Sequence, residues 1–474
     1  MHTDESINAY IIGQLLAGEK FHYDPQDRHG PALAAETLPV VRLLGAEKFA
    51  DLTETQLRLV PALTGAALVL LFGAGVEMFG FIACLVAALL FAFAPLPVYY
   101  SRYFIHETLF VTATLGLLLS GWRALQKKSV LAAVLAGFCA ALMLACKETA
   151  VIHFFALVVA LLAVRFGTPA SGQARMRKSQ EHAGSETGVP SAKLFLAAAG
   201  IFILTAVLFF TWFGQSWSGL ADLFRAIPHL ASRAGGEGHE KPFWYYAALF
   251  DSTWSGGFLL ELSLLGIVVA VFEFKRRNIS LAFISIYFLV VFGIYSAIPY
   301  KTPWLALNFW LPVALLDGIA AWWFWKALEK SFARWLLFVP VILIGASMGK
   351  DVQKLVFKIP ADEKNPYAYA HTGEDLLRLP GRLEELARQI KTPNPRIAVV
   401  AADAWPLPWY LRKFSQAGFW QPGQATGAAD FFITSTAAAE KMEDQLKNFR
   451  PEFFGARPGV LLILWTPSPT EPKP

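Results

Sequence analysis

Acidic, basic and histidine side chains recur in short polar runs along this 474-residue chain. Carboxylates can take a proton from a polar acceptor or hold a metal ion, and Lys and Arg can bind a phosphate. A site that combines them would deprotonate an acceptor and hold an anionic ligand. The runs contain Asp4 and Glu5; Asp24, Asp27, Arg28 and His29; Arg102, His106 and Glu107; Lys147 and Glu148; and Tyr300 and Lys301.

The elements that must position these side chains are membrane helices. The chain is 55% hydrophobic and only 16% charged, with a mean hydropathy of +0.45, which is typical of an integral membrane protein. Its apolar runs are continuous rather than alternating, so they predict helices and not barrel strands. Ten runs approach the roughly 20 residues that cross a bilayer. They are 59–75, 78–96, 107–122, 129–145, 149–164, 194–213, 255–272, 279–298, 304–325 and 335–349.

Charge predicts which side of the membrane each loop occupies, because Lys and Arg accumulate in cytoplasmic loops. Four basic loops fall on one side when the ten helices are counted. Their cations are Arg123, Lys127 and Lys128; Arg165, Arg175, Arg177, Lys178 and Lys193; Lys275, Arg276 and Arg277; and Lys326, Lys330 and Arg334. The polar runs then gather on the extracytoplasmic side of a multi-pass protein of the cell (inner) membrane. In such a protein the expected phosphate is lipid-borne, as in a polyprenyl-phosphate sugar.

The chain divides into three predicted parts. Residues 1–58 form a first extracytoplasmic loop with the acidic pair, residues 59–349 form the transmembrane domain, and residues 350–474 form a small soluble α/β domain outside the cytoplasm. Apolar runs of strand length lie at 396–402, 430–435 and 460–466 in the last part. Because MHTDESINAY is predicted to be external without an export signal, we expect a further membrane helix to precede Met1.

Several motifs resemble those of a known family. The acidic pair and the runs RYFIHE, KET, HEKPFWYY, YKTPW, NPYAYAHT and WPLPWYLR resemble the Agl23-type (flippase activity-associated) branch of the membrane glycosyltransferases. That branch is similar to the protein mannosyltransferases and shares the multi-helix GT-C fold. The resemblance implies that a sugar passes from a polyprenyl-phosphate donor to a glycan, lipid or protein acceptor on the extracytoplasmic face. No nucleic-acid partner is expected.

The resemblance also implies residue roles. The catalytic carboxylate falls on Asp4, with Glu5 beside it, and the second acidic motif falls on His106 and Glu107. Lipid phosphate and donor contacts fall on Arg102, Lys147, Tyr300 and Lys301, and an acceptor or substrate loop on Arg28, His29 and His239. A divalent cation, Mg²⁺ or Mn²⁺, is permitted at Asp4, His106 and Glu107, although the ligand geometry is not fixed.

Other interpretations remain open for the same residues. Asp4 and Glu5 could simply cap a helix, and Lys147 and Lys301 could extend to the membrane interface without binding a ligand. A non-enzymatic protein that flips or transports lipid-linked sugars would use the same cations but not the acids. A glycan polymerase or ligase would instead depend on arginine.

Overall fold

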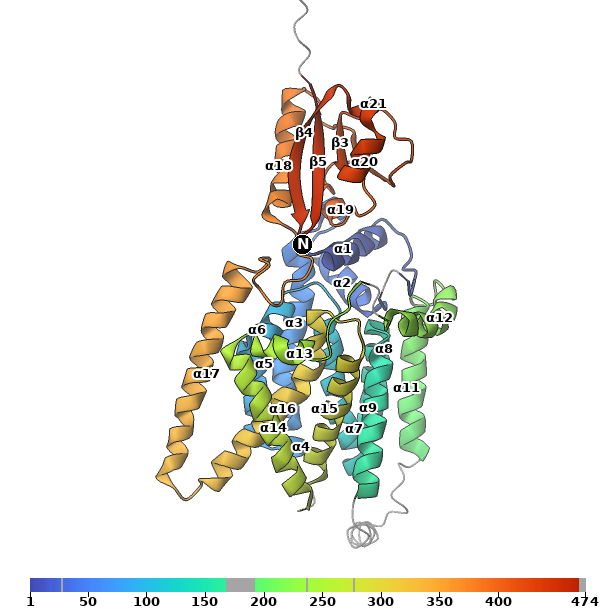
Figure 1. Ribbon diagram of the computed structural model, residues 1–474. Coiled ribbons are helices and arrows are strands. Elements are labelled where there is room, and N and C mark those ends of the chain that lie inside the picture. The colour runs from blue at the N-terminus through green and yellow to red at the C-terminus, as the bar shows by residue number, and fades with distance from the viewer. Residues whose placement is uncertain (27–28, 168–191, 236–237, 276–277, 469–474) are drawn as a thin grey trace, which may run out of the picture. The chain divides into compact units, whose positions relative to one another are not determined.

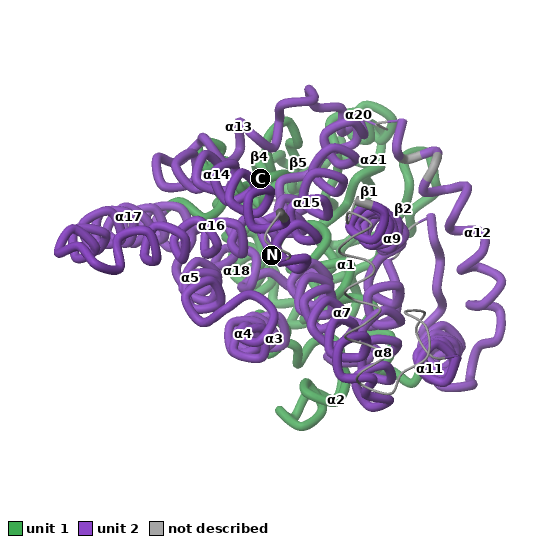
Figure 2. The backbone as a smooth tube through the Cα atoms, turned by 90° about the horizontal axis from the view of Figure 1, so that it is seen from below, with its two compact units in different colours: residues 1–19, 38–57, 359–474 green, residues 20–37, 58–358 purple. Residues whose placement is uncertain are grey.

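The computed structural model describes residues 1–26, 29–167, 192–235, 238–275 and 278–468. The chain forms two compact units, coloured separately in Figure 2. Unit 1 contains Met1–Glu19, Leu38–Leu57 and Ile359–Pro474, and unit 2 contains Lys20–Thr37 and Arg58–Lys358. The N-terminal residues that carry Asp4 and Glu5 therefore belong to the same unit as the C-terminal sheet.

Unit 2 is built from apolar helices, and a helix lies over each predicted membrane segment. These helices are α3 Glu54–Leu71, α5 Phe81–Phe93, α7 Glu107–Lys127, α8 Val130–Cys146, α9 Ala150–Gly167, α11 Ala192–Phe210, α14 Trp254–Lys275, α15 Ile279–Ala297, α16 Leu307–Ala327 and α17 Phe338–Asp351. Seven helical stretches of the described residues are long and apolar enough to span a membrane, and three apolar helices are shorter. The prediction of a multi-pass helical membrane protein is confirmed.

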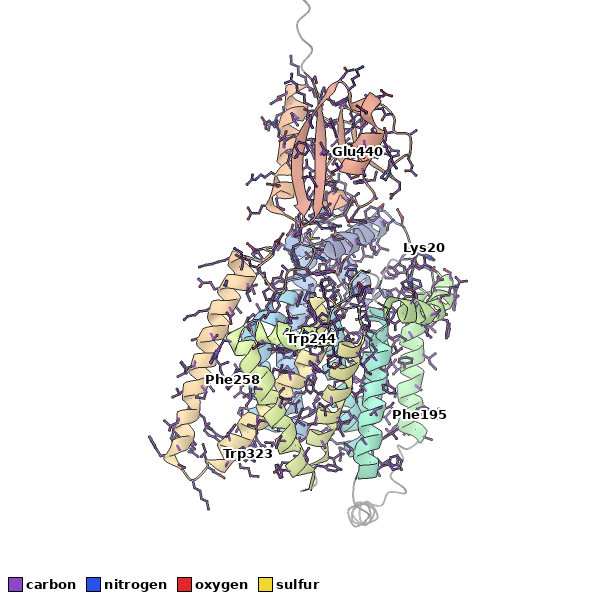
Figure 3. All side chains as sticks on the ribbon, viewed as in Figure 1. Lys20, Phe195, Trp244, Phe258, Trp323 and Glu440 are labelled. Carbon is purple, nitrogen blue, oxygen red and sulfur yellow. The ribbon has the colours of Figure 1, made fainter. Side chains whose placement is uncertain are left out.

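Helix α16 is the central helix of unit 2. The membrane-length stretch that contains it is 94% buried, and the helix contacts α5, α7, α14 and α15 (Figure 1). Small residues allow this packing, as is common between membrane helices. A Cβ on Gly318 would lie 2.3 Å from the Ala83 carbonyl oxygen of α5. By contrast Phe195 on α11 is exposed, as expected for a helix that faces lipid (Figure 3).

Shorter elements complete the helical part. They are α1 Thr3–Leu16, α2 Ala32–Leu43, α4 Val76–Phe79, α6 Pro95–Tyr100, α12 Ser218–Arg233 and α13 Tyr245–Asp251, with the 3-10 helices η1 Phe49–Asp51, η2 Phe72–Gly75, η3 Pro303–Ala306 and η4 Phe332–Leu337 and the π-helix η5 Val352–Lys358. Helix α12 carries its apolar side chains at helical spacing, so its amphipathic character follows from the sequence.

Unit 1 contains a five-stranded sheet with the strand order β2-β1-β3-β5-β4. The strands are β1 Ile397–Val400, β2 Ala417–Trp420, β3 Phe431–Ser435, β4 Phe449–Arg457 and β5 Val460–Pro467. Strand β1 is parallel to β2 and β3, whereas β5 is antiparallel to β3 and β4. The helices of this region are α18 Glu374–Gln389, α19 Leu407–Tyr410, α20 Thr436–Lys441 and α21 Glu443–Leu446, and α18 packs beside β4 (Figure 1).

Candidate functional site

The acidic pair lies in the first turn of α1, in unit 1. His2 caps this helix, because the Asp4 backbone N–H donates to His2 Nδ1 at 3.1 Å and the His2 N–H donates to Glu5 Oε2 at 2.9 Å. Glu5 is fully buried, so its carboxylate has the structural role of a helix cap. Asp4 contributes only its backbone to the cap, and its half-buried side chain remains a candidate for chemistry.

Arg457 of β4 lies beside the start of α1. Its guanidinium donates to Thr3 Oγ1 at 3.2 Å and to the Trp405 carbonyl at 2.8 Å, and it pairs with Asp403. Burial lowers the pKa of Arg457, and the nearby Asp4 carboxylate opposes that shift. The Asp4 carboxylate therefore lies close enough to the Arg457 guanidinium for the two charges to interact.

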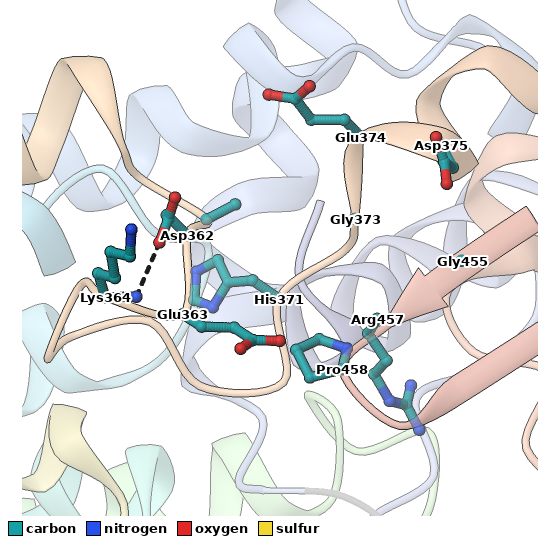
Figure 4. Close-up of a pocket in the computed structure, with 11 residues that line it drawn as sticks. Asp362, Glu363, Lys364, His371, Gly373, Glu374, Asp375, Gly455, Arg457 and Pro458 are labelled. Carbon is teal, nitrogen blue, oxygen red and sulfur yellow. Dashed lines mark hydrogen bonds between the residues drawn. The ribbon is translucent and has the colours of Figure 1, made fainter.

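Arg457 also lines a pocket of 560 Å³ within unit 1 (Figure 4). The other lining residues are Ala361, Asp362, Glu363, Lys364, His371, Gly373, Glu374, Asp375, Gly455 and Pro458. Burial is the main reason that the pKa of His371 falls to about 3, so its imidazole is neutral near pH 7. Its ring lies 5.1 Å from the ring of His2, the cap of α1. Sequence reasoning did not assign this pocket, although NPYAYAHT contains His371.

In unit 2 the ends of α7 and α8 bring several predicted residues together. Helix α7 begins at Glu107 and α8 ends at Cys146, so Glu107 and Lys147 meet in a buried ion pair. The segment before α2 lies against the same helix end, because the Gly30 N–H donates to the Cys146 carbonyl at 3.2 Å. A Cβ on Gly30 would lie 2.1 Å from the Ala145 carbonyl oxygen, so only glycine allows this approach.

We call the resulting group the polar cluster. It consists of Tyr23, His29, His106, Glu107, Lys147 and Glu148. The Tyr23 hydroxyl donates to Glu148 Oε1 at 2.6 Å, and His29 Nδ1 lies 3.3 Å from Glu148 Oε2. His106 Nε2 lies 3.2 Å from the Gly30 carbonyl oxygen. The sequence identified His29, His106, Glu107 and Lys147 but gave no role to Glu148. Nothing distinguished Tyr23 from other aromatic residues.

The electrostatics of the polar cluster fix several charges. Burial opposes ionisation of Glu148, but His29 and Tyr23 more than offset it and lower the pKa of Glu148 to about 2. Burial, followed by the charges of His29 and Lys147, holds the pKa of His106 well below its usual range. Burial and the Glu148 charge raise the pKa of Tyr23. Near neutral pH, Glu148 is therefore an anion and His106 and Tyr23 are uncharged.

A second group of predicted residues meets where residues 239–241 pair with residues 299–301. The Lys301 N–H donates to the His239 carbonyl at 3.1 Å, and Lys301 Nζ donates to the Lys241 carbonyl at 3.2 Å and to the Ile298 carbonyl. The rings of His239 and Tyr300 are 4.8 Å apart. Lys301 is 1% exposed, and burial lowers its pKa. Its ammonium joins two loops here.

Two other predicted residues lie apart from these groups or cannot be placed. Arg102 donates to the Val356 carbonyl at 3.1 Å, and its guanidinium lies 4.5 Å from the Phe357 ring centroid, so it contacts η5. Arg28 lies outside the described residues. Among the residues that the structure describes, no group of three or more His, Cys, Asp and Glu could hold a metal ion. The Glu107 carboxylate pairs with Lys147, and the divalent cation stays a prediction from the sequence.

The chain is similar to known proteins in part of its sequence and in its fold. Residues 43–171 match the family described as dolichyl-phosphate-mannose-protein mannosyltransferase. ArnT from Cupriavidus metallidurans in the apo state has a TM-score of 0.62 at 15% identity, over 97% of this chain and 93% of that one. The same protein bound to undecaprenyl phosphate gives 0.61 at 16% identity, over 99% and 95%. No curated protein sequence matches the chain.

A third solved structure is also similar in fold. The archaeal oligosaccharyltransferase AglB from Archaeoglobus fulgidus, in complex with an inhibitory peptide and a dolichol-phosphate, has a TM-score of 0.58 at 13% identity, over 100% of this chain and 71% of that one. The chain has the GT-C fold. The chain is similar to the protein mannosyltransferases over residues 43–171, as predicted, and the narrower Agl23-type resemblance stays a prediction.

Proposed function

We propose that this protein, which has the GT-C fold, is a glycosyltransferase that moves a sugar from a polyprenyl-phosphate donor to an acceptor on the extracytoplasmic face. The observation that carries the proposal is similarity along 99% of the chain to ArnT, which was solved with undecaprenyl phosphate bound. Lys301, whose side chain is 1% exposed, supplies a buried cation in unit 2. Buried cations suit a lipid phosphate, which must be held where water is scarce.

The proposed reaction forms one bond and breaks another. The acceptor oxygen bonds to the anomeric carbon of the sugar as the bond between that carbon and the phosphate oxygen breaks. The electron pair leaves with the polyprenyl phosphate, and the acceptor's proton passes to a base. Asp4 is the proposed catalytic carboxylate, which either takes this proton or stabilises positive charge that develops on the sugar.

Asp4→Asn tests this assignment. The change keeps the backbone N–H that completes the α1 cap, so folding should be preserved while sugar transfer is lost. The measurement is release of free polyprenyl phosphate and appearance of labelled acceptor from purified protein in nanodiscs supplied with polyprenyl-phosphate sugars. Glu19→Gln is the control, since Glu19 is an exposed acid just beyond the same helix.

The outcomes separate the rival functions. Unchanged turnover in Asp4→Asn would falsify the catalytic assignment. A wild-type protein that moves lipid-linked sugar across vesicles but releases no polyprenyl phosphate would instead be the flipping or transport accessory protein. Screening donors that differ only in the sugar then tests whether mannose is preferred.

A further inference from the structure

The polar cluster contains a carboxylate and an imidazole arranged as a dyad. Both Glu148 oxygens are occupied, Oε1 by the Tyr23 hydroxyl at 2.6 Å and Oε2 by His29 Nδ1 at 3.3 Å. Because Glu148 is an anion above about pH 2, it can only accept hydrogen bonds. Its partner nitrogen on His29 must therefore carry a proton, and the carboxylate sets the tautomer of the ring.

The other ring nitrogen of His29 is available. Among the described residues Nε2 of His29 has no hydrogen-bond partner, and the side chain is 36% exposed. His106 differs in both respects, because it is 4% exposed and its Nε2 meets the Gly30 carbonyl. A histidine held through Nδ1 by a carboxylate, with Nε2 accessible, is the arrangement in which imidazole acts as a general base.

Charge in the cluster favours proton uptake at His29 over phosphate binding. The charged groups around it are the Glu148 and Glu107 carboxylates and the Lys147 ammonium, and His106 and Tyr23 are neutral. When His29 is neutral, the net charge of these groups is −1. A proton on His29 brings the net charge to zero. More remote acids, Asp24 and Asp222, act on Tyr23 and add negative charge. An anionic phosphate would meet a net negative group.

We propose that His29, oriented by Glu148 and Tyr23, is the general base that takes the proton from the acceptor. This inference rests on the proposed function. The acceptor O–H gives its proton to Nε2, and its oxygen forms the bond to the anomeric carbon as polyprenyl phosphate leaves. The imidazolium then returns the proton to water. In this proposal Asp4 does not take the acceptor's proton.

The test is the pH dependence of transfer in matched variants. His29→Gln should lower kcat by about 10² to 10⁴-fold, the usual contribution of a general base, with little change in KM for the donor. His22→Gln is the control, because His22 is an exposed histidine seven positions earlier in the same segment. Wild-type kcat should fall on the acid side, where the general base is protonated, and this acid limb should be absent from the residual activity of His29→Gln.

Two further variants distinguish catalysis from structure. His29→Ala should regain part of its activity when imidazole is added, which a purely structural histidine would not show. Glu148→Gln removes the anion that favours an imidazolium, so the acid limb of the profile should move to lower pH. An acid limb that persists unchanged in the residual activity of His29→Gln would overturn the proposal.

A second measurement does not depend on transfer. Diethyl pyrocarbonate modifies unprotonated, accessible imidazole nitrogens, so mass spectrometry should show rapid labelling of His29 and little labelling of buried His106. Glu148→Gln removes the partner of Nδ1, so it should alter the labelling rate of His29. If the protein transfers no sugar but His29 labels in this way, the proposed function fails while the reactive dyad stands. An unreactive His29 would refute the dyad itself.

Discussion

At the scale of single residues, burial and pairing decide which charged groups can act. Glu107 is 3% exposed and Lys147 is 7% exposed, and each is the other's ion-pair partner. The sequence indicated both residues from their positions at helix ends. It could not indicate the pair, because they lie 40 positions apart and on different helices. The same applies to His2, which caps α1 although Asp4 and Glu5 are the acids that the sequence suggests as caps.

The Glu107 and Lys147 pair makes a prediction about stability. Breaking a buried pair leaves an uncompensated charge and costs about 3 to 5 kcal/mol, whereas replacing both partners by neutral groups can cost far less. We expect Glu107→Gln and Lys147→Met each to lower the thermal unfolding midpoint of the purified protein strongly. The double variant Glu107→Gln/Lys147→Met should recover much of the loss. Simple addition of the two single losses would show that the two residues do not act as a pair.

At the scale of elements, apolar helices and central strands were predictable, but edge strands were not. Continuous apolar runs predicted the membrane helices, and three apolar runs predicted β1, β3 and β5. Strands β2 and β4 were missed because they lie at the sheet edges and are only partly buried, so their sequences lack a continuous apolar run. Strand β4 even contains Pro451, which edge strands tolerate. How loops converge on a site depends on such packing, which local sequence does not encode.

Close helix packing gives a prediction at this scale. Gly318→Ala on α16 would place a Cβ 2.3 Å from the Ala83 carbonyl oxygen, so α5 and α16 must separate. Overpacking of this kind typically costs about 1 to 3 kcal/mol. Gly200→Ala on α11 is the matched control, because among the described residues no atom beyond its chain neighbours and its own helix backbone lies within 4 Å of the added methyl group. The unfolding midpoint should fall for Gly318→Ala and hold or rise slightly for Gly200→Ala, where alanine favours the helix. Equal midpoints would contradict the close contact.

At the scale of the whole molecule, the chain segments that make up unit 1 constrain the membrane topology. Unit 1 contains residues both before and after the membrane helices, so these residues must share one side of the membrane. The chain therefore crosses an even number of times between Leu57 and Ile359. The seven long helical stretches found in the described residues give an odd number, so among the helices described there, one or all three of the shorter apolar ones must also cross. If all ten helices cross, the number is even, and the four basic loops fall on one side of the membrane as the positive-inside rule requires.

Cysteine labelling tests this topology and the side on which transfer is proposed. Single cysteines at Glu19 and Glu363, exposed in unit 1, should react with a membrane-impermeant maleimide in intact spheroplasts. A cysteine at Lys330, exposed between α16 and α17, should react only after permeabilisation, because the basic loops are predicted to be cytoplasmic. Cys139, the half-buried native thiol, is replaced by alanine first to limit background.

Reaction of positions 19 and 363 from opposite sides would require an odd number of crossings, which one compact unit cannot accommodate. Labelling of both only after permeabilisation would place unit 1 in the cytoplasm and exclude transfer on the extracytoplasmic face.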